Sequence, residues 1–204
     1  MTARTSMANL IATLRGFTNA GTADYSIGST AYWSDDQLQS ILDRNRVNLR
    51  EVPLTSHPLL NSGGSFDYND YQAECGWLET TLGGTARFIV TDGMGSAIGT
   101  ANWTADYEIG LVTFLNNQAG SARAVIGFSY DVYAAAADIW QQKAAAYAAA
   151  VDFSTINHSI KRSHIVANCE RMAQKYSMMA TTGQGTAGST RTDRGDQSTG
   201  CSND

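Results

Sequence analysis

Apolar residues follow a helical spacing through a long stretch of the chain that contains no glycine and no proline. This stretch covers residues 128–182, although the chain carries 19 glycines in all. Intervals of three and four residues place side chains on one face of an α-helix. The first half of the stretch predicts a long helix that packs this face into the core. The stripe consists of Tyr130, Tyr133, Ala137, Trp140, Ala144, Tyr147 and Val151.

A second stripe of the same kind follows a break near residues 152–157. Its apolar positions are Ile165, Cys169, Met172, Tyr176 and Met179. Aromatic side chains at helical spacing are more often packed in a core than used to bind a cofactor or a base. From the two stripes we therefore assign core packing to Tyr133, Trp140, Tyr147, Met172 and Tyr176.

A shorter amphipathic helix is indicated near the N-terminus. Leu10, Leu14 and Phe17 share one face at the spacing of an α-helix. The segment that follows, residues 16–33, is rich in glycine and threonine, and we expect it to be a loop.

Another short helix is predicted to begin after Ser34. Ser34 can cap its N-terminus while Gln37 reaches back in a capping box, and the acidic residues between them meet the positive end of the helix dipole. Leu38 and Leu42 are its expected core residues, and we extend the apolar stripe as far as Leu49.

The middle of the chain changes from helical spacing to short β-favouring runs separated by glycine, asparagine and aspartate. Residues 87–91, followed by Asp92 and Gly93, have the pattern of a strand entering a hairpin turn. A second hairpin is expected from residues 111–115 and 122–128. Both prolines of the chain lie in residues 51–65, which we interpret as a linker. The outcome expected for this region is a small antiparallel sheet.

These patterns predict an α+β fold that is mainly an α-helical bundle of about four helices. Residues 1–52 and 129–180 would form the bundle, and residues 53–128 would supply the linker and an inserted antiparallel β module. Residues 181–204 contain no apolar residue larger than alanine or cysteine. Such a polar tail cannot support its own core, so we expect it to be flexible.

The charge and the apolar content exclude several classes of protein. A net charge of -5 argues against a protein that grips nucleic acid by its phosphates. No apolar segment is long enough to cross a bilayer or to serve as a secretory signal, so we expect a soluble protein made in a cytoplasm. The three cysteines are odd in number and far apart, which favours free thiols.

The residues with catalytic or metal-binding chemistry do not form a recognisable motif. Three glycines after the first predicted hairpin strand miss the dinucleotide-binding spacing and are better explained as turn glycines. His164 and Cys169 are five residues apart and would lie on different faces of a helix. We expect the histidines and the loop carboxylates to be solvated, and we predict no catalytic residue, no cofactor and no metal site. The residues considered were His57, His158, His164, Asp67, Asp70, Glu74, Gly93, Gly95 and Gly99.

The long helix carries alanines on the side away from its aromatic stripe. Alanine contributes little to solubility on an exposed surface, so a face of alanines indicates a second packed surface. In a homo-oligomer this face would contact a neighbouring subunit. The candidate subunit-interface residues are Ala135, Ala136, Ala145, Ala146 and Ala149.

Several of these segments together resemble a known family. The run YWSDDQLQSILDRNR at residues 32–46 is followed, much later, by YDVYAAAADIWQQKAAAYAAAVDFST at residues 130–155. HSIKRSHIVANCERMAQKY at residues 158–176 continues the match, and the D-Y-x-x-G-x-V-T-F run at residues 106–114 looks like a β insertion of that family. In order and spacing these segments resemble the head-to-tail connector, or adaptor, proteins of long-tailed bacteriophages.

The resemblance implies a virion structural protein of the neck, between capsid and tail, and not an enzyme. About twelve copies would form a ring beneath the portal protein and contact a head-closure or tail-completion protein. DNA would pass through the ring during ejection without sequence-specific binding, and no membrane would be involved. The polar tail would dock on the portal, with Arg191, Asp193 and Arg194 as the candidate residues.

Two alternatives remain open on the sequence. One is a ligand-binding β domain carried on a helical oligomerisation stalk, which would be favoured if residues 66–128 bound a glycan or another cell-surface ligand. An enzyme is the other alternative, and it ranks behind both binding roles because no catalytic motif accompanies the helices.

Overall fold

The computed structural model describes residues 3–21, 25–27, 30–80, 87–148, 153–154, 159–160 and 162–183. Its helices are α1 (Ala8–Thr18), α2 (Asp35–Arg44), α3 (Val132–Ala148) and α4 (Arg162–Gly183), with 3-10 turns at Thr5–Met7 and Thr100–Asn102. The strands are β1 (Tyr25–Ile27), β2 (Thr30–Tyr32), β3 (Arg46–Pro53), β4 (Thr55–Leu60), β5 (Phe66–Gln72), β6 (Phe88–Asp92), β7 (Ala97–Ile98), β8 (Trp103–Asp106), β9 (Leu111–Phe114), β10 (Arg123–Tyr130), β11 (Phe153–Ser154) and β12 (Ser159–Ile160).

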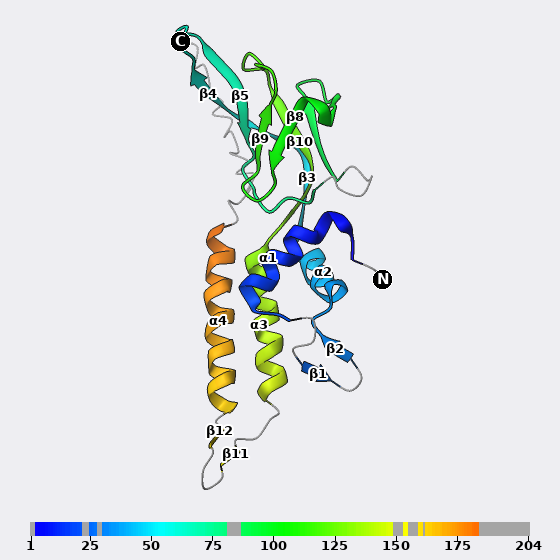
Figure 1. Ribbon diagram of the computed structural model, residues 1–204, viewed down its shortest axis with the longest axis vertical. Helices are drawn as coiled ribbons and strands as arrows, with labels where there is room; N and C mark the ends of the chain where they lie inside the picture. The colour runs from blue at the N-terminus through cyan, green and yellow to red at the C-terminus, as the bar shows by residue number, and fades with distance from the viewer. Residues whose placement is uncertain are drawn as a thin grey trace, which may run out of the picture.

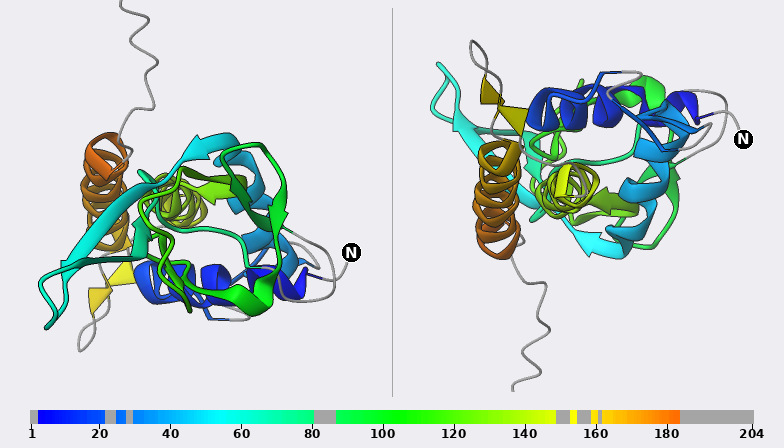
Figure 2. Two further views of the ribbon diagram at one scale, coloured as in Figure 1. Left: turned by 90° about the horizontal axis from the view of Figure 1, so that it is seen from above. Right: turned by 90° about the horizontal axis from the view of Figure 1, so that it is seen from below.

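The molecule is elongated, with the helices toward one end and the two larger sheets at the other (Figure 1). α3 and α4 run antiparallel along the long axis, and the short β11–β12 hairpin lies beyond their far end. Seen along that axis, α3 lies between α1, α2 and α4, while α4 stands at the outside of the group (Figure 2). α3 is therefore the central helix and α4 the peripheral one.

The β region consists of two four-stranded antiparallel sheets, in the orders β3-β10-β6-β7 and β4-β5-β9-β8. Only Leu54 separates β3 from β4, so one bent strand forms an edge of both sheets. Leu54 is buried at this corner, and its backbone N–H donates to the Arg123 carbonyl at 2.8 Å. Pro53 and Pro58 both lie in this bent strand, where an edge position tolerates the missing N–H.

Two clusters of buried side chains stabilise the two regions. The helical core lies among the four helices and the end of β10 and comprises Met7, Leu10, Ile11, Leu14, Ala20, Trp33, Leu38, Ile41, Leu42, Tyr130, Val132, Ala135, Ala136, Ala137, Ile139 and Tyr176. The β core lies between the sheets and comprises Leu49, Leu54, Tyr71, Ala73, Leu78, Phe88, Val90, Trp103, Val112, Phe114 and Val125. β10 contributes to both clusters and thus connects them.

The expected fold class, a mainly α-helical bundle, is wrong, because the β region is a substantial second unit with its own core. The helix predicted through Leu49 ends at Arg44, and the chain becomes a strand at Arg46. In this segment apolar Val47 and Leu49 alternate with Arg46, Asn48 and Arg50, which is the period of a strand. The spacing from Leu42 to Leu49 also fits a helix, and that coincidence caused the error.

Two further predictions about the β region are also wrong. Residues 51–65, interpreted as a linker, contain the end of β3, all of β4 and the turn before β5. β9 and β10 form as strands but do not pair with each other: β9 lies between β5 and β8, and β10 between β3 and β6. The first predicted hairpin is confirmed, because β6 pairs with β7.

The helix predictions succeed better. Ser34 and Gln37 form the predicted capping box at α2, and Leu38 and Leu42 are buried. α3 begins at Val132, two residues later than its aromatic stripe, because β10 extends through Tyr130. Asp131 caps it by accepting from the backbone N–H of Ala134 at 2.8 Å. The segment expected to be a loop after α1 contains the β1–β2 hairpin.

Candidate functional site

The helical and β regions meet along residues 76–80, which cross from the β8–β9 turn to the N-terminal segment. Trp77 and Leu78 donate their backbone N–H groups to the carbonyls of Glu108 and Tyr107, at 3.0 and 2.8 Å. The Glu79 N–H donates to the Phe128 carbonyl at 3.0 Å. The crossing is tight, because a Cβ added at Gly76 would collide with the Glu108 carbonyl. This segment therefore fixes the two regions against each other.

A buried carboxylate, that of Glu79, lies at the centre of this junction. It accepts hydrogen bonds from the Ser6 and Tyr130 hydroxyls, each at 2.6 Å, and from Arg4 Nε at 3.1 Å. Arg4 also forms a bidentate ion pair with Asp43, with nitrogen–oxygen distances of 2.9 and 2.7 Å. The network joins the N-terminal segment, α2, β10 and the crossing segment.

The electrostatics of the network fit a structural role. Burial, followed by the neighbouring Glu79 carboxylate, raises the pKa of Tyr130 well above its ordinary value. The hydrogen bond to Asp43 raises the pKa of the Arg4 guanidinium. Glu79 is 1% exposed, so a substrate has no access to its carboxylate. We interpret the network as a polar connection that fixes the two regions, not as a catalytic centre.

Sequence reasoning missed Glu79, which stands alone among apolar and neutral residues at positions 76–80. A single acid in an apolar run is a weak indication of a buried ion pair. Its partners Ser6, Arg4 and Tyr130 are 73, 75 and 51 residues away. Local spacing cannot reveal such a contact.

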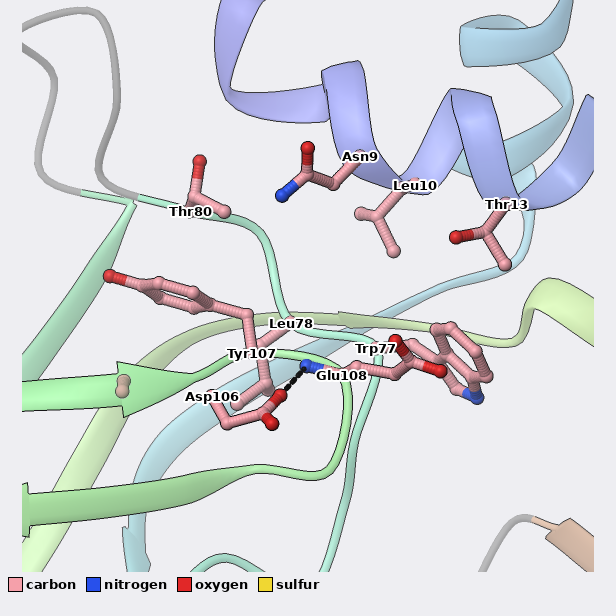
Figure 3. A pocket seen from close by; sticks show the side chains of 10 residues that line it. Asn9, Leu10, Thr13, Trp77, Leu78, Thr80, Asp106, Tyr107 and Glu108 are labelled. Carbon is pink, nitrogen blue, oxygen red and sulfur yellow. Dashed lines mark hydrogen bonds between the residues drawn. The ribbon is translucent and has the colours of Figure 1, made fainter.

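Beside the crossing segment lies a pocket of about 360 Å³, which we name the junction pocket (Figure 3). α1 forms one wall, residues 77–80 the back, and the β8–β9 turn the opposite wall. Its lining residues are Asn9, Leu10, Thr13, Trp77, Leu78, Thr80, Ala105, Asp106, Tyr107 and Glu108. Because these residues include two carboxylates and no basic side chain, the pocket suits a cationic group better than an anion.

The turn that forms one wall of the junction pocket is held rigidly. Asp106 Oδ1 accepts from the backbone N–H groups of Glu108 and Ile109, at 3.0 and 3.4 Å. Gly110 has a φ of 75°, and a Cβ there would collide with the Cys75 carbonyl. Asp106 is thus committed to the turn, whereas Glu108 is exposed at the pocket.

Three large apolar side chains gather at the end of the β4–β5 hairpin, which we name the hairpin tip. Leu59, Leu60 and Phe66 are 60%, 66% and 55% exposed. Leu60 and Phe66 are cross-strand partners, and the hairpin projects beyond the body of the molecule (Figure 1). A projecting apolar group of this kind is typical of a contact surface.

The predicted alanine face is only partly available to a second subunit. Ala135 and Ala136 are fully buried in the helical core, so their assignment to a subunit interface is wrong. They are small because α3 is the central helix and its neighbours approach it closely. Ala145 is exposed and Ala146 half-buried, while Ala149 lies outside the described residues.

The predicted core residues mostly lie where expected. Leu38, Leu42 and Tyr176 are buried in the helical core, and Tyr133, Trp140 and Met172 pack against it as partly buried residues. Tyr147 is half-buried but does not belong to this core. The portal-docking candidates Arg191, Asp193 and Arg194 lie outside the described residues, so they stay a prediction.

His158, one of the residues considered for catalysis or metal binding, lies outside the described residues, and the others are dispersed or engaged in local contacts. His57 and His164 are exposed, Asp67 accepts from Asn117 at 3.0 Å, and Asp70 accepts from Thr113 at 2.8 Å. Burial raises the pKa of the Cys75 and Cys169 thiols, which makes them weaker nucleophiles. Within the ranges that the structure describes, no group of three His, Cys, Asp or Glu residues could hold a metal.

Comparison of the chain with protein-family models, with curated proteins and with solved structures gave no match. Among the described helices, none is long and apolar enough to cross a bilayer. The function must therefore be argued from the surfaces of this chain and from the pattern of its residues.

Proposed function

We propose that this chain is a virion structural protein, a head-to-tail adaptor that forms a ring between a portal protein and the tail or head-closure proteins. The observation that carries the proposal is the hairpin tip, where Leu59, Leu60 and Phe66 project into solvent. An exposed apolar group at the end of a hairpin gives no advantage to a protein that works alone. It suits insertion into a neighbouring protein.

A second exposed surface lies along α4. This helix packs against α3 on one side and is exposed along its outer side. Met178 is 61% exposed there, whereas Ile165, at 41%, lies on the side of Cys169 and Tyr176 that packs against the core. A peripheral helix with an exposed apolar residue on its open side fits a subunit that is completed by neighbours in an assembly.

The order of the elements agrees with the adaptor resemblance in its helical part. α1 and α2 precede the β region, and the α3–α4 hairpin follows it, so the quoted segments at residues 32–46 and 130–176 fall on or beside helices. A conduit for DNA should repel its phosphates weakly and bind no sequence. The net charge of -5 suits that requirement.

The junction pocket favours the alternative function, a ligand-binding β domain on a helical oligomerisation stalk. A concave site of about 360 Å³ with two aromatic and several polar side chains has the size of a small-ligand site. Testing this alternative requires the whole chain, because residues 66–128 lack α1, which supplies Asn9, Leu10 and Thr13 of the pocket lining. Binding of a glycan to the whole chain at this pocket would favour the alternative.

Reconstitution with the portal protein of the same virus, followed by electron microscopy, tests the adaptor function. We expect a ring of this protein on one face of the portal, and density for it between capsid and tail in the virion. Leu59→Ser combined with Leu60→Ser should remove docking. Met94→Ser is the matched control, because Met94 is 94% exposed in the β6–β7 turn, outside the hairpin tip.

A virion whose neck lacks the chain would contradict the adaptor function. Unchanged docking by the double serine variant would contradict only the role of the hairpin tip and would leave the function without the observation that carries it.

A further inference from the structure

We propose that copies of this chain contact one another head to tail, with the exposed edge of β3 in one copy lying against the junction pocket of the next. The contact would place an arginine from β3 at the pocket carboxylates. The inference adds the surfaces by which neighbouring subunits of the proposed ring would contact each other. Only the ring's place in the virion rests on the proposed adaptor function; the contact itself does not.

The edge of β3 is an open, positively charged surface. β3 pairs with β10 on one side only, and its residues Arg46, Asn48 and Arg50 are exposed. Arg44, at the end of α2, extends the same surface. Neither Arg44 nor Arg50 has an ion-pair partner within the described part of the chain. Arg46 stacks its guanidinium over the Phe128 ring, with Cζ 4.6 Å from the centroid.

The junction pocket has the opposite charge. Its lining includes the carboxylates of Asp106 and Glu108 and no lysine, arginine or histidine. Glu108 lines the pocket, and its side chain is exposed. The neutral lining residues Asn9, Thr13 and Thr80 could accept further hydrogen bonds from a guanidinium.

The two surfaces complement each other in charge. Residues 44–53 carry Arg44, Arg46 and Arg50 against Glu51, which gives +3 − 1 = +2. The pocket lining carries the acids Asp106 and Glu108 and no basic residue, which gives −2. In a chain whose net charge is -5, the β3 edge is a basic segment that an acidic partner would complement.

The positions of the surfaces predict the symmetry of the contact. Along the long axis, β3 and α1 lie on opposite sides of the molecule (Figure 2). A contact between two different surfaces on opposite sides is heterologous, and it generates a closed ring or an open filament. A symmetric dimer would instead use one surface twice.

Backbone pairing does not select β3 over β4 for the contact. β4 contains Pro58 and an irregular register between His57 and Leu59, and β3 has its own irregularity, a register shift opposite Val125 and Gly127 with a φ of 50° at Glu51. The contact therefore depends on the arginine side chains of β3.

Neutral substitutions test the contact, with self-association measured by sedimentation in low salt. Arg46→Gln with Arg50→Gln alters the β3 edge, and Glu108→Gln alters the pocket while keeping its backbone bonds. Each variant should weaken self-association at least about tenfold, and salt should weaken the wild-type contact similarly. Glu74→Gln, an exposed carboxylate that belongs neither to the β3 edge nor to the pocket lining, is the control for the loss of one charge and should change nothing.

A mixing experiment separates a head-to-tail contact from a symmetric one. The edge variant keeps an intact pocket, and the pocket variant keeps an intact edge. Mixed together, they should form one-to-one dimers that neither forms alone. Three results would each overturn the inference. Wild-type protein could stay monomeric, only one of the two variants could lose self-association, or the mixture could fail to form dimers.

The outcomes distinguish this contact from the proposed function. If the variants behave as expected but the chain is missing from the neck, the contact stands and the adaptor function fails. If rings form on the portal with both variants at wild-type affinity, the adaptor function stands and this contact is wrong.

Discussion

The helical core and the β core differ in how their backbone groups find partners. At the helical core, Lys143 Nζ donates to the carbonyls of Thr18 and Asn19, at 2.9 and 3.2 Å, at the end of α1. Aromatic rings meet in both regions: Phe88 meets Trp103 and Tyr107 edge to face at 5.7 and 5.4 Å in the β core, and Phe17 stacks on Tyr133 and Tyr176 at 5.4 and 5.7 Å beside the helical core. Helices gathered from distant parts of a chain expose backbone ends that need partners, whereas paired strands satisfy one another.

The largest expected effect falls on the centre of the helical core. Ala136→Glu would place a charge where no partner is available and should destabilise the fold by about 4 kcal/mol or more. Ala145→Glu, on the exposed side of the same helix, should change the free energy of unfolding by less than about 0.5 kcal/mol. Urea melts followed by circular dichroism measure both variants. Similar losses of unfolding free energy in Ala136→Glu and Ala145→Glu would show that α3 is not oriented as described.

Phe88→Ala tests whether the β core unfolds with the helical core. Removing this buried ring should cost about 3 to 5 kcal/mol. Because β10 contributes to both cores, we expect the backbone amides of α3 and those of β9 to lose protection from hydrogen exchange in one transition. Phe66→Ala at the hairpin tip is the matched control and should have almost no effect. Two separate transitions would mean that the junction does not couple the regions.

Tyr130→Phe tests the junction itself. The hydroxyl donates to Glu79 at 2.6 Å and accepts from Arg4 at 3.2 Å, so its loss should cost about 1 to 3 kcal/mol. Tyr133→Phe is the control, because its half-buried ring stacks on Phe17 and its hydroxyl is outside the network. An equal loss of unfolding free energy in the two variants would show that the Tyr130–Glu79 network does not contribute to stability.

The raised pKa of Tyr130 predicts that the difference in stability between wild type and Tyr130→Phe depends on pH. The pKa of Tyr130 is raised in the folded protein above an ordinary value of about 10. Below about pH 10 the Tyr130 hydroxyl keeps its proton in both the folded and the unfolded protein, so its full stabilising effect is present. Above about pH 10 this tyrosine ionises first in the unfolded chain, so the difference in free energy of unfolding between wild type and Tyr130→Phe should shrink. Melts between pH 8 and pH 11 measure this difference; an advantage that grows with pH would contradict the assignment.

The smallest effect on stability belongs to the hairpin tip. Leu60→Ser should leave the free energy of unfolding within about 0.5 kcal/mol of wild type, because the side chain is already in solvent. A thermal melt compares the two proteins. A clear loss of stability would place Leu60 against the fold and would weaken its interpretation as a contact surface.

The helices were more predictable than the sheets. The capping box of α2 and the stripes of α1, α3 and α4 follow from residues within one or two turns of each other. Strand pairing joins distant residues, such as Arg46 with Tyr130, and no local signal selects β10 over β9 as a partner. Residues 46–53 show the remaining ambiguity, because their apolar positions fit both periods.

The candidate surfaces were less predictable still. An alanine at a helical position has the same identity whether it is buried like Ala136 or exposed like Ala145. Only the arrangement of α1, α2 and α4 around α3 separates the two cases. The junction pocket and Glu79 depend on contacts between segments that are dozens of residues apart, and these follow from the completed fold.

The pairing of Arg46 with Tyr130 has a consequence for how such a protein can evolve. The Asp131 N–H donates to the Asn45 carbonyl at 2.9 Å, so the chain leaves the helices and returns to them at neighbouring positions. Paired strands stand only about 5 Å apart, a gap that a tight turn can span. The far end of the β region, beyond residues 76–80, can therefore change in length while α2 and α3 keep their places, whereas Glu79 and its partners tie the near end to the helices.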